Sequence, residues 1–257
     1  MAMLAILILT YNEEANITEC IKSAQFADEI VVIDSGSTDK TIEIATSLGV
    51  KCIFHSMREG FAAQRNFALT QTNAEWVMFL DADERITSEL SDEIRSVISN
   101  QEAYSWEILR VNILFGQRVY YGGHSPDWSL RLYPRTAIRW EGSVHEKALV
   151  TLPVRKLKNT MLHYTYTTWD RYLFKLSQYT SLMAQQMFER HKKARFIDIV
   201  FRPWFAFLRF YLLKSGWRDG KIGFIMAVFH GFYTMTKYVR LYTLHKQKEY
   251  NDESRNF

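Results

Sequence analysis

Two carboxylates separated by one residue follow an apolar run near position 80. The run is Trp76–Leu80, and Asp81, Ala82 and Asp83 come directly after it. Side chains two positions apart in an extended segment point the same way, so Asp81 and Asp83 are expected to face one spot. Carboxylates just past a buried strand suit Mg²⁺ or Mn²⁺ with a phosphorylated substrate. Because helix caps and turns often contain Asp-x-Asp as well, this pattern alone leaves both interpretations open.

The elements around this pair predict an α/β domain. Strands are expected at residues 4–9, 29–33, 50–54 and 76–80, with helices between them. One of these helices carries its apolar residues on one face: Ile17, Cys20, Ile21 and Ala24. Strands that alternate with helices at this spacing predict a parallel sheet with right-handed crossovers. Residues 105–150 instead predict short mixed or antiparallel strands, and an amphipathic helical pattern begins at Trp169.

Polar side chains follow three of the expected strands. Thr10, Tyr11 and Glu13 offer an aromatic face and polar groups to a base, and Asp34 could accept from a ribose hydroxyl or a base N–H. Each segment alone is also ordinary turn chemistry, but capping does not require ligand-type residues at all three strand ends. The chain lacks a Gly-x-Gly-x-x-Gly fingerprint and a P-loop.

Charge is divided unevenly along the chain. Residues 1–150 hold 13 Lys and Arg against 21 Asp and Glu, whereas residues 151–257 hold 19 against 7. The rear half interleaves these basic residues with aromatic ones from Phe196 to Tyr242. Such a segment predicts helices that lie on an anionic membrane surface, although a packed helical cap or an oligomer interface would use the same residues. Nucleic acid is not an expected partner, because the basic residues stand among long apolar stretches.

Other features of the sequence bear on the compartment. The longest uncharged run in the rear half, Ile222 to Thr236, has 15 residues, and a spanning helix needs about 20. Cys20 and Cys52 are the only cysteines, which favours a reducing compartment. The segment Met1–Leu4 lacks a basic region and predicts a first strand, not a signal peptide.

Several motifs together resemble a known family. The three strand-end segments, Leu9–Glu14, Val32–Asp39 and Leu80–Glu84, are similar to the nucleotide-sugar-binding signatures of glycosyltransferase family 2, and Gly60–Asn66 resembles its Gly-x-x-x-x-Arg-Asn segment. Three later segments resemble a subgroup that extends lipopolysaccharide core, of the WaaE/KdtX glucosyltransferase type: His124–Trp128, Leu130–Tyr133 and Trp140–Glu146. The resemblance implies the GT-A fold, a Rossmann-like mixed sheet flanked by helices, here with a C-terminal amphipathic helical region. It also implies an inverting transfer from a nucleotide sugar, with UDP-hexose as the expected donor.

The resemblance assigns donor and metal roles residue by residue. Asp83 would be the principal ligand of Mg²⁺ or Mn²⁺, and Asp81 would contact the ribose or, through water, the metal. Asp34 would hold the uracil or ribose, with Thr10, Tyr11 and Glu13 around the base. Arg65 would offset diphosphate charge or brace the acidic cluster, and a structural ion pair is an equal alternative. The two remaining candidates, for the metal shell or the diphosphate, are His145 and His163.

The catalytic base stays open between two carboxylates. Inversion needs one carboxylate to deprotonate the acceptor hydroxyl. Many relatives carry a Glu-Asp pair for this, and this chain has His145-Glu146 instead. Glu146 is the first candidate and Asp127 the second.

The expected organisation has three parts. Residues 1–165 would form the catalytic domain, with nucleotide-sugar binding in 1–100 and acceptor binding and catalysis in 101–165. Residues 166–246 would form the membrane-associating helices and 247–257 a polar tail. The expected acceptor is a lipid-linked glycan at the cytoplasmic face of the cell membrane, and a homo-oligomer is possible. Two other hypotheses are a catalytically silent membrane scaffold of the same fold and a nucleotidyltransferase. A nucleotidyltransferase would need a Gly-rich loop with Arg or Lys after the first strand, and this sequence has none there.

Overall fold

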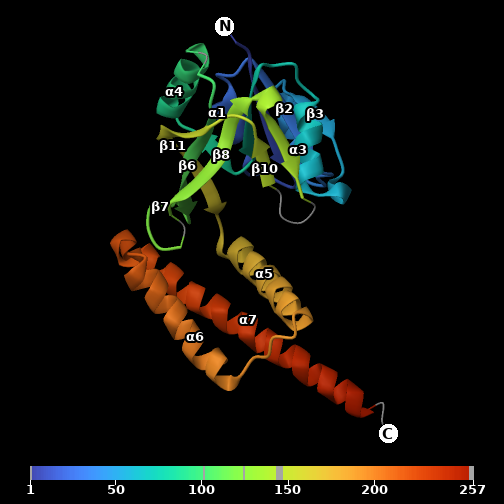
Figure 1. The fold of residues 1–257 in the computed structure, drawn as a ribbon, viewed down its shortest axis with the longest axis vertical. Coiled ribbons are helices and arrows are strands. Elements are labelled where there is room, and N and C mark those ends of the chain that lie inside the picture. Colours follow the sequence, from blue (N-terminus) through green and yellow to red (C-terminus); the bar gives the residue numbers. More distant parts are fainter. Residues whose placement is uncertain (1, 101, 124, 143–146, 255–257) are drawn as a thin grey trace. The chain divides into compact units, whose positions relative to one another are not determined.

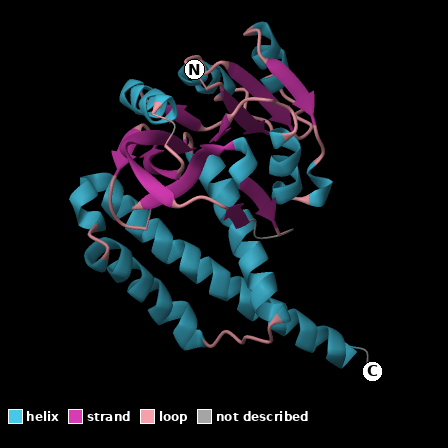
Figure 2. Cartoon of the chain, turned by 45° about the horizontal axis from the view of Figure 1, so that its top comes forward, coloured by secondary structure: helices cyan, strands magenta, loops and turns pink. Residues whose placement is uncertain are grey.

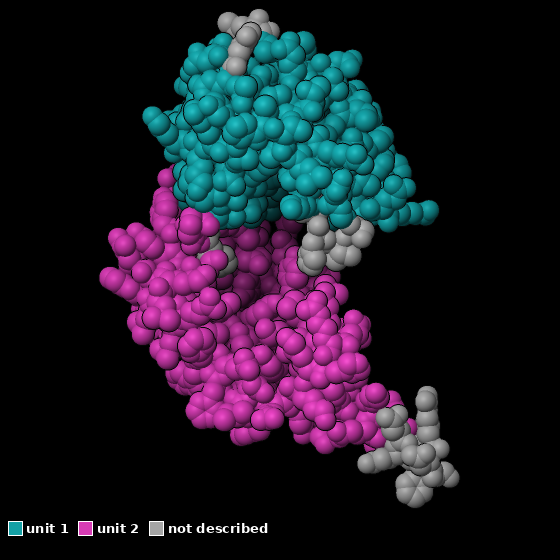
Figure 3. Space-filling view, in the orientation of Figure 1, with its two compact units in different colours: residues 1–111, 127–164 teal, residues 112–126, 165–257 magenta. Residues whose placement is uncertain are grey.

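The computed structural model describes residues 2–100, 102–123, 125–142 and 147–254. The chain divides into two compact units, which Figure 3 colours separately. The first comprises residues 1–111 and 127–164, and the second comprises residues 112–126 and 165–257.

A mixed sheet forms the centre of the first unit (Figure 1). Its strand order is β3-β2-β1-β4-β8-β6-β11-β5. The first four strands in the chain are parallel, and β8 joins β4 in the antiparallel sense. The strands are β1 (Leu4–Thr10), β2 (Glu29–Asp34), β3 (Lys51–Phe54), β4 (Trp76–Asp81), β5 (Glu84–Ile86), β6 (Ser105–Leu114), β7 (Gln117–Val119), β8 (Asp127–Pro134), β9 (Ile138–Glu141), β10 (Lys147–Val150) and β11 (Val154–Tyr166).

Helices cover both faces of this sheet (Figure 2). On one face, α1 (Ile17–Ala24), α2 (Thr41–Ser47) and α4 (Ser88–Ser99) bury their apolar residues against the strands. On the other face, α3 (Phe61–Leu69) packs with Trp140 of β9 against Phe79 of β4. The expected apolar face of α1 is confirmed, since all four of its predicted residues are buried. A short 3₁₀ turn, η1 (Met57–Glu59), precedes α3, and another, η2 (Arg135–Ala137), precedes β9.

The predicted alternation of strands and helices is confirmed through residue 100, and the antiparallel strands expected between 105 and 150 are present. The apolar runs carry this prediction, because a strand buried on both faces is apolar at nearly every position. β1 illustrates it: Ala5 to Ile8 are fully buried, and β2 and β4 flank them.

The second unit is a helical hairpin with a third helix. Its elements are α5 (Trp169–Glu189), α6 (Phe196–Leu208), a π-helical turn η3 (Arg209–Leu213), η4 (Gly216–Asp219) and α7 (Gly220–Ser254). Both α5 and α6 pack on α7. The helical pattern expected from Trp169 is therefore confirmed at the residue where α5 begins.

Residues 119–123, which begin at the end of β7, pack into this helical unit. Asp219 accepts hydrogen bonds from the backbone N–H groups of Tyr120 and Tyr121, at 3.0 and 2.9 Å. The ring of Phe210 lies against Gly122, whose φ is +74°. A Cβ at Gly122 would stand 2.4 Å from that ring, so the position requires glycine for space as well as for backbone conformation.

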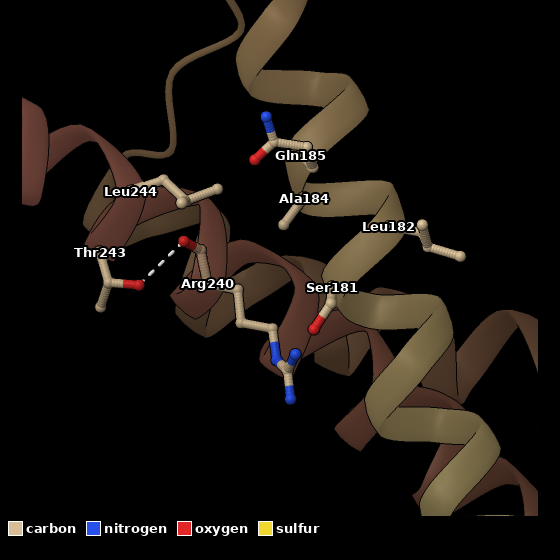
Figure 4. Close-up of a pocket in the computed structure, with 7 residues that line it drawn as sticks. All are labelled: Ser181, Leu182, Ala184, Gln185, Arg240, Thr243 and Leu244. Atoms are coloured by element: carbon tan, nitrogen blue, oxygen red, sulfur yellow. Dashed lines mark hydrogen bonds between the residues drawn. The ribbon is translucent and has the colours of Figure 1, made fainter.

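The surface of the second unit is unusually apolar. On α6, Phe196, Phe201, Trp204 and Phe205 are each more than 60% exposed, and no α6 residue is buried. A groove with polar side chains lies between α5 and α7, and its lining includes Ser181, Gln185 and Thr243 (Figure 4). Among the described residues, no helix has both the length and the apolar character needed to cross a bilayer.

Candidate active site

The segment after β4 forms a turn. The strand ends at Asp81, and Ala82 and Asp83 turn the chain into β5, so the extended geometry expected for the two carboxylates is wrong. The Asp81 carboxylate faces arginines, and the Asp83 carboxylate faces His163. Glu84 explains the turn, because its Oε2 accepts the backbone N–H of Asp81 at 2.9 Å and is fully buried.

A chain of alternating charges runs beneath this turn. Arg131 of β8 donates from Nη2 to Asp81 Oδ2 and to Glu84 Oε1, each at 2.5 Å. Arg110 of β6 continues it, with Nη1 3.1 Å from Glu84 Oε1 and Nη2 2.9 Å from Asp127. At the other end, Arg65 Nη2 lies 3.7 Å from Asp81 Oδ1. We call this set of residues the arginine–carboxylate network; its members, from one end to the other, are Arg65, Asp81, Arg131, Glu84, Arg110 and Asp127.

The network fixes the charge of Asp81. Burial raises the pKa of the Asp81 carboxyl, but the attraction of Arg131 and Arg65 is larger in sum and brings this pKa well below its usual range. Burial also raises the pKa of Glu84, against the attraction of Arg131. The neighbouring carboxylates raise the pKa of the Arg131 guanidinium despite its burial, so it stays charged. Asp81 is therefore held as an anion at the strand ends.

Sequence reasoning missed Arg131, Arg110 and Glu84. Arg131 sits at an irregularity in the pairing of β6 with β8, where Trp106 pairs with Leu132 and Glu107 with Leu130. Such a bulge adds one residue to a strand and re-aims a side chain, which simple alternation does not anticipate. The available signal was a charged residue inside an apolar strand, as in Leu130-Arg131-Leu132.

Asp83 and His163 form a second pair beside the network. His163 Nε2 lies 3.5 Å from Asp83 Oδ2, and the two side chains are 16% and 19% exposed. Register explains the approach, because His163 of β11 pairs with Glu84 of β5 and the Tyr164 N–H donates to the Asp83 carbonyl. Within the described part of the chain there is no group of three or more His, Cys, Asp or Glu arranged for a metal.

The ends of β2, β1 and β4 lie side by side in the sheet. Thr10 pairs with Asp34 across these strands, and Leu9 pairs with Asp81 on the other side. The Asp34 carboxylate accepts from the backbone N–H groups of Gly36 and Ser37 at 2.8 and 2.9 Å, so it closes its own turn.

The other predicted base-binding residues differ in exposure. Tyr11 is 57% exposed, whereas Thr10 is buried and its Oγ1 has no hydrogen-bond partner among the described residues. The Glu13 backbone N–H donates to Thr41 Oγ1 at 2.8 Å, which joins the two strand-end loops.

Arg65 is held by aromatic rings. Its guanidinium carbon lies 4.9 Å from the centroid of Phe79 and 4.7 Å from that of Trp140. Asn66 makes two hydrogen bonds to the Trp140 backbone, at 2.7 and 2.9 Å. The Arg-Asn pair thus docks β9 on α3 and fixes Arg65 beside Asp81, a geometry that fits bracing of the acidic cluster.

The two candidate bases differ in what the structure says of them. Asp127 is paired with Arg110 and is part of the network. His145 and Glu146 lie outside the described residues, between the end of β9 and the start of β10.

Comparison with known proteins decides the family. Residues 5–140 match Glycosyl transferase family 2, which is more than half of the chain. The lipopolysaccharide core biosynthesis glycosyltransferase LpsC of Rhizobium meliloti is 31% identical, over 95% of this chain and 94% of that protein. The chain belongs to glycosyltransferase family 2. This glycosyltransferase has the GT-A fold, a curled mixed sheet flanked by helices, as the sequence predicted.

Other relatives are more distant. An uncharacterised glycosyltransferase of Rickettsia typhi, RT0209, is 26% identical over all of this chain and 90% of its own length. Among solved structures, glucosyl-3-phosphoglycerate synthase of Mycobacterium tuberculosis matches with a TM-score of 0.37 and 23% identity, over 43% of each chain.

Proposed function

We propose that this glycosyltransferase moves a hexose from a UDP-sugar to a lipid-linked glycan such as lipopolysaccharide core, with inversion and with a divalent metal. The observation that carries the proposal is the pairing at the strand ends. There, an arginine network keeps Asp81 anionic, and Asp83 and His163 form a separate pair next to it. A salt-bridge network with only a structural role would not need a separate carboxylate–imidazole pair beside it.

Asp83 and His163 fit a metal of the Mg²⁺ or Mn²⁺ class. The Asp83 carboxylate and the His163 imidazole, 3.5 Å apart, would supply two ligands, and such sites complete their shell with substrate phosphates and water. His145 is a further candidate ligand. When bound, the metal would neutralise the charge that develops on the departing nucleotide diphosphate.

The chain's own residues would do the remaining work on the donor. Asp81 would orient the ribose or the metal's water, because Arg131 and Arg65 fix its position. Asp34 keeps the loop after β2 in shape, and the base would lie against Tyr11 with Thr10 and Glu13 around it.

Glu146 remains the first candidate for the base that deprotonates the acceptor hydroxyl, and Asp127 the second. Asp127 would have to give up part of its pairing with Arg110 in order to take a proton. That requirement counts against Asp127, since a general base needs a free oxygen directed at its substrate.

Two observations support a lipid-linked acceptor: the name of one relative, and the exposed apolar surface of α6. LpsC is named for lipopolysaccharide core biosynthesis, and it covers nearly the whole of this chain. In this proposal residues 1–165 are catalytic, and residues 166–246 lie peripherally on the inner face of the cell membrane through the exposed aromatic side chains of α6. The basic residues of the rear half would face anionic headgroups.

A donor panel tests the proposal. Purified protein is incubated with UDP- and GDP-hexoses, with Mn²⁺, Mg²⁺ or EDTA, and hydrolysis and binding are measured. We expect one UDP-hexose to bind and turn over only with the metal present. Absence of turnover with every donor, together with intact folding, would favour the catalytically silent scaffold.

A further inference from the structure

An apolar groove runs along the α6–α7 pair in the second unit. Its volume is about 660 Å³, within the roughly 300–1,000 Å³ of small-molecule sites. Six of the residues that line it are Val200, Pro203, Trp204, Phe224, Val228 and Phe232. The described lining contains no charged side chain, so the groove suits a hydrocarbon chain and not a sugar or a nucleotide.

The two helices are antiparallel, and their close approach makes the floor of the groove. Phe207 of α6 contacts Phe224 near the start of α7, whereas Arg202 lies over Tyr238 further along α7. Between these points a Cβ on Gly231 would stand 3.1 Å from the Pro203 carbonyl oxygen. Gly231 therefore allows the two helix backbones to approach closely. Trp204 of α6 and Phe232 of α7 line the groove beside this contact.

Positive charge lies next to this groove, on residues that do not themselves line it: Arg202 precedes Pro203, and Lys237 follows Met235 by two positions. Arg202 and Lys237 both lie over the Tyr238 ring, at 5.1 and 5.3 Å from its centroid. Burial, together with the charges of Arg202 and Lys192, lowers the pKa of Lys237. One carboxylate, Asp198, pairs with Arg202 at 2.5 Å, so it offsets one of these charges and leaves an excess of positive charge. An apolar groove with a cationic end is complementary to a lipid that has one free chain and an anionic headgroup.

We propose that the α6–α7 groove binds one hydrocarbon chain of an anionic phospholipid, with its phosphate at the Arg202–Lys237 end. The proposal rests on the membrane association proposed above and goes further, because it names a stoichiometric lipid site and not only an adhesive surface. Such a site would fix which way the helices lie in the lipid headgroup layer.

The test uses the full chain and dodecyl phosphate below its critical micelle concentration, measured by isothermal titration calorimetry. We expect one equivalent to bind. Val228→Trp, which fills the groove, should weaken binding about tenfold or more, because the hydrocarbon chain of the ligand can then bury less of its surface in the groove. Lys237→Gln should weaken binding a few-fold and reduce its dependence on salt. Inorganic phosphate alone should not bind measurably.

Two further variants keep the test sharp. Leu173→Trp on α5 is the matched control, since Leu173 and Val228 are both 44% exposed and Leu173 does not line the groove. We expect Leu173→Trp to bind as the wild type does. If Val228→Trp misfolds by circular dichroism, Val200→Trp fills the same groove from α6. Equal binding by Val228→Trp and Leu173→Trp would overturn the proposal.

Oligomeric state and vesicle flotation separate this proposal from its rivals. A wild-type dimer that becomes a monomer in Val228→Trp would show that a second copy covers the groove, and the lipid site would be wrong. Flotation with anionic vesicles without binding of dodecyl phosphate would overturn the groove site alone. Dodecyl phosphate binding without flotation would support the groove and remove the membrane association.

Discussion

The two units of this glycosyltransferase place charge and apolar surface in opposite ways. The first unit buries charge: Glu84 is fully buried and Arg131 is 3% exposed, and they neutralise each other. The helical unit exposes apolar surface instead, with Phe196 79% and Phe201 65% exposed on one helix. Soluble proteins rarely expose large contiguous apolar patches, and they bury charges mainly in pairs.

The contrast indicates what each unit is arranged to meet. Buried ion pairs are weak sources of stability, so a network of six charged residues beneath the strand ends is better explained by positioning of Asp81 than by folding. The aromatic side chains that α6 leaves more than 60% exposed bury little surface within the helical unit, and they are better explained by a partner that is itself apolar. Each prediction below breaks one side of this contrast.

The largest effect is expected at the catalytic base. Glu146→Gln should keep donor affinity and lose turnover by about 10²–10⁴-fold, since a base acts in the transition state. Single-turnover kinetics with donor and acceptor measures this. The control is Glu141→Gln, an exposed carboxylate at the end of β9, which should be fully active. If Glu146→Gln is active and Asp127→Asn is dead, the two roles are reversed.

Removal of Arg131 should break the buried network. Arg131→Met leaves Asp81 and Glu84 without their shared partner, and loss of one member of a buried pair costs about 3–5 kcal/mol of unfolding free energy. Urea unfolding followed by fluorescence measures the loss. Arg139→Met, at a 76% exposed arginine with a 3.8 Å contact to Glu141, should change stability little. Equal stability of the two variants would show that the network is dispensable for folding.

Two exposed aromatic residues of α6 test the helical unit. The double variant Phe201→Ser and Phe205→Ser should fold normally and bind anionic vesicles at least about tenfold more weakly, because each Phe gives up apolar burial in the lipid. This change is cleaner than deletion from Phe196, which would strip α7 from Tyr172 and Leu176 in the core of the unit. Flotation is the readout. The control is Phe54→Ser, because Phe54 is 68% exposed but lies in the first unit.

Asp81 gives a smaller and pH-dependent effect. Its folded-state pKa is below the unfolded value of about 3.9, so its stabilising contribution is complete above that value. The contribution is lost only as pH falls through the folded-state pKa. Asp81→Asn should therefore destabilise the protein by about 1–3 kcal/mol at pH 7, and the difference from wild type should shrink below about pH 4. A difference that instead grows on acidification would contradict the assigned ionisation.

The sequence predicts the strands well and their side-chain partners poorly. The apolar run before Asp81 determines β4, and the helical pattern from Trp169 determines the start of α5. In contrast, the contact between Asp83 and His163 depends on the register of β5 with β11, which joins residues about 80 positions apart. Local pattern carries no information on such a pairing.

The same limit explains the error at the Asp-x-Asp segment. The rule for side chains two apart assumes an extended chain, and Glu84 turns the chain by accepting the Asp81 N–H. The pairing of Arg131 with Asp81 could not be predicted locally, because the bulge at Arg131 depends on how β8 pairs with β6. Motif resemblance recovered the family because it uses residue identities that pattern rules do not weigh.

The most direct test of the account is binding of UDP to wild type, Asp83→Asn and Asp92→Asn, measured calorimetrically with Mn²⁺ and with EDTA. Asp92 is an exposed carboxylate on α4 and serves as the matched control. We expect Mn²⁺-dependent binding in wild type and Asp92→Asn, and loss of both affinity and Mn²⁺ dependence in a folded Asp83→Asn. Unchanged Mn²⁺-dependent binding of UDP by Asp83→Asn would contradict the metal-assisted donor site at the strand ends.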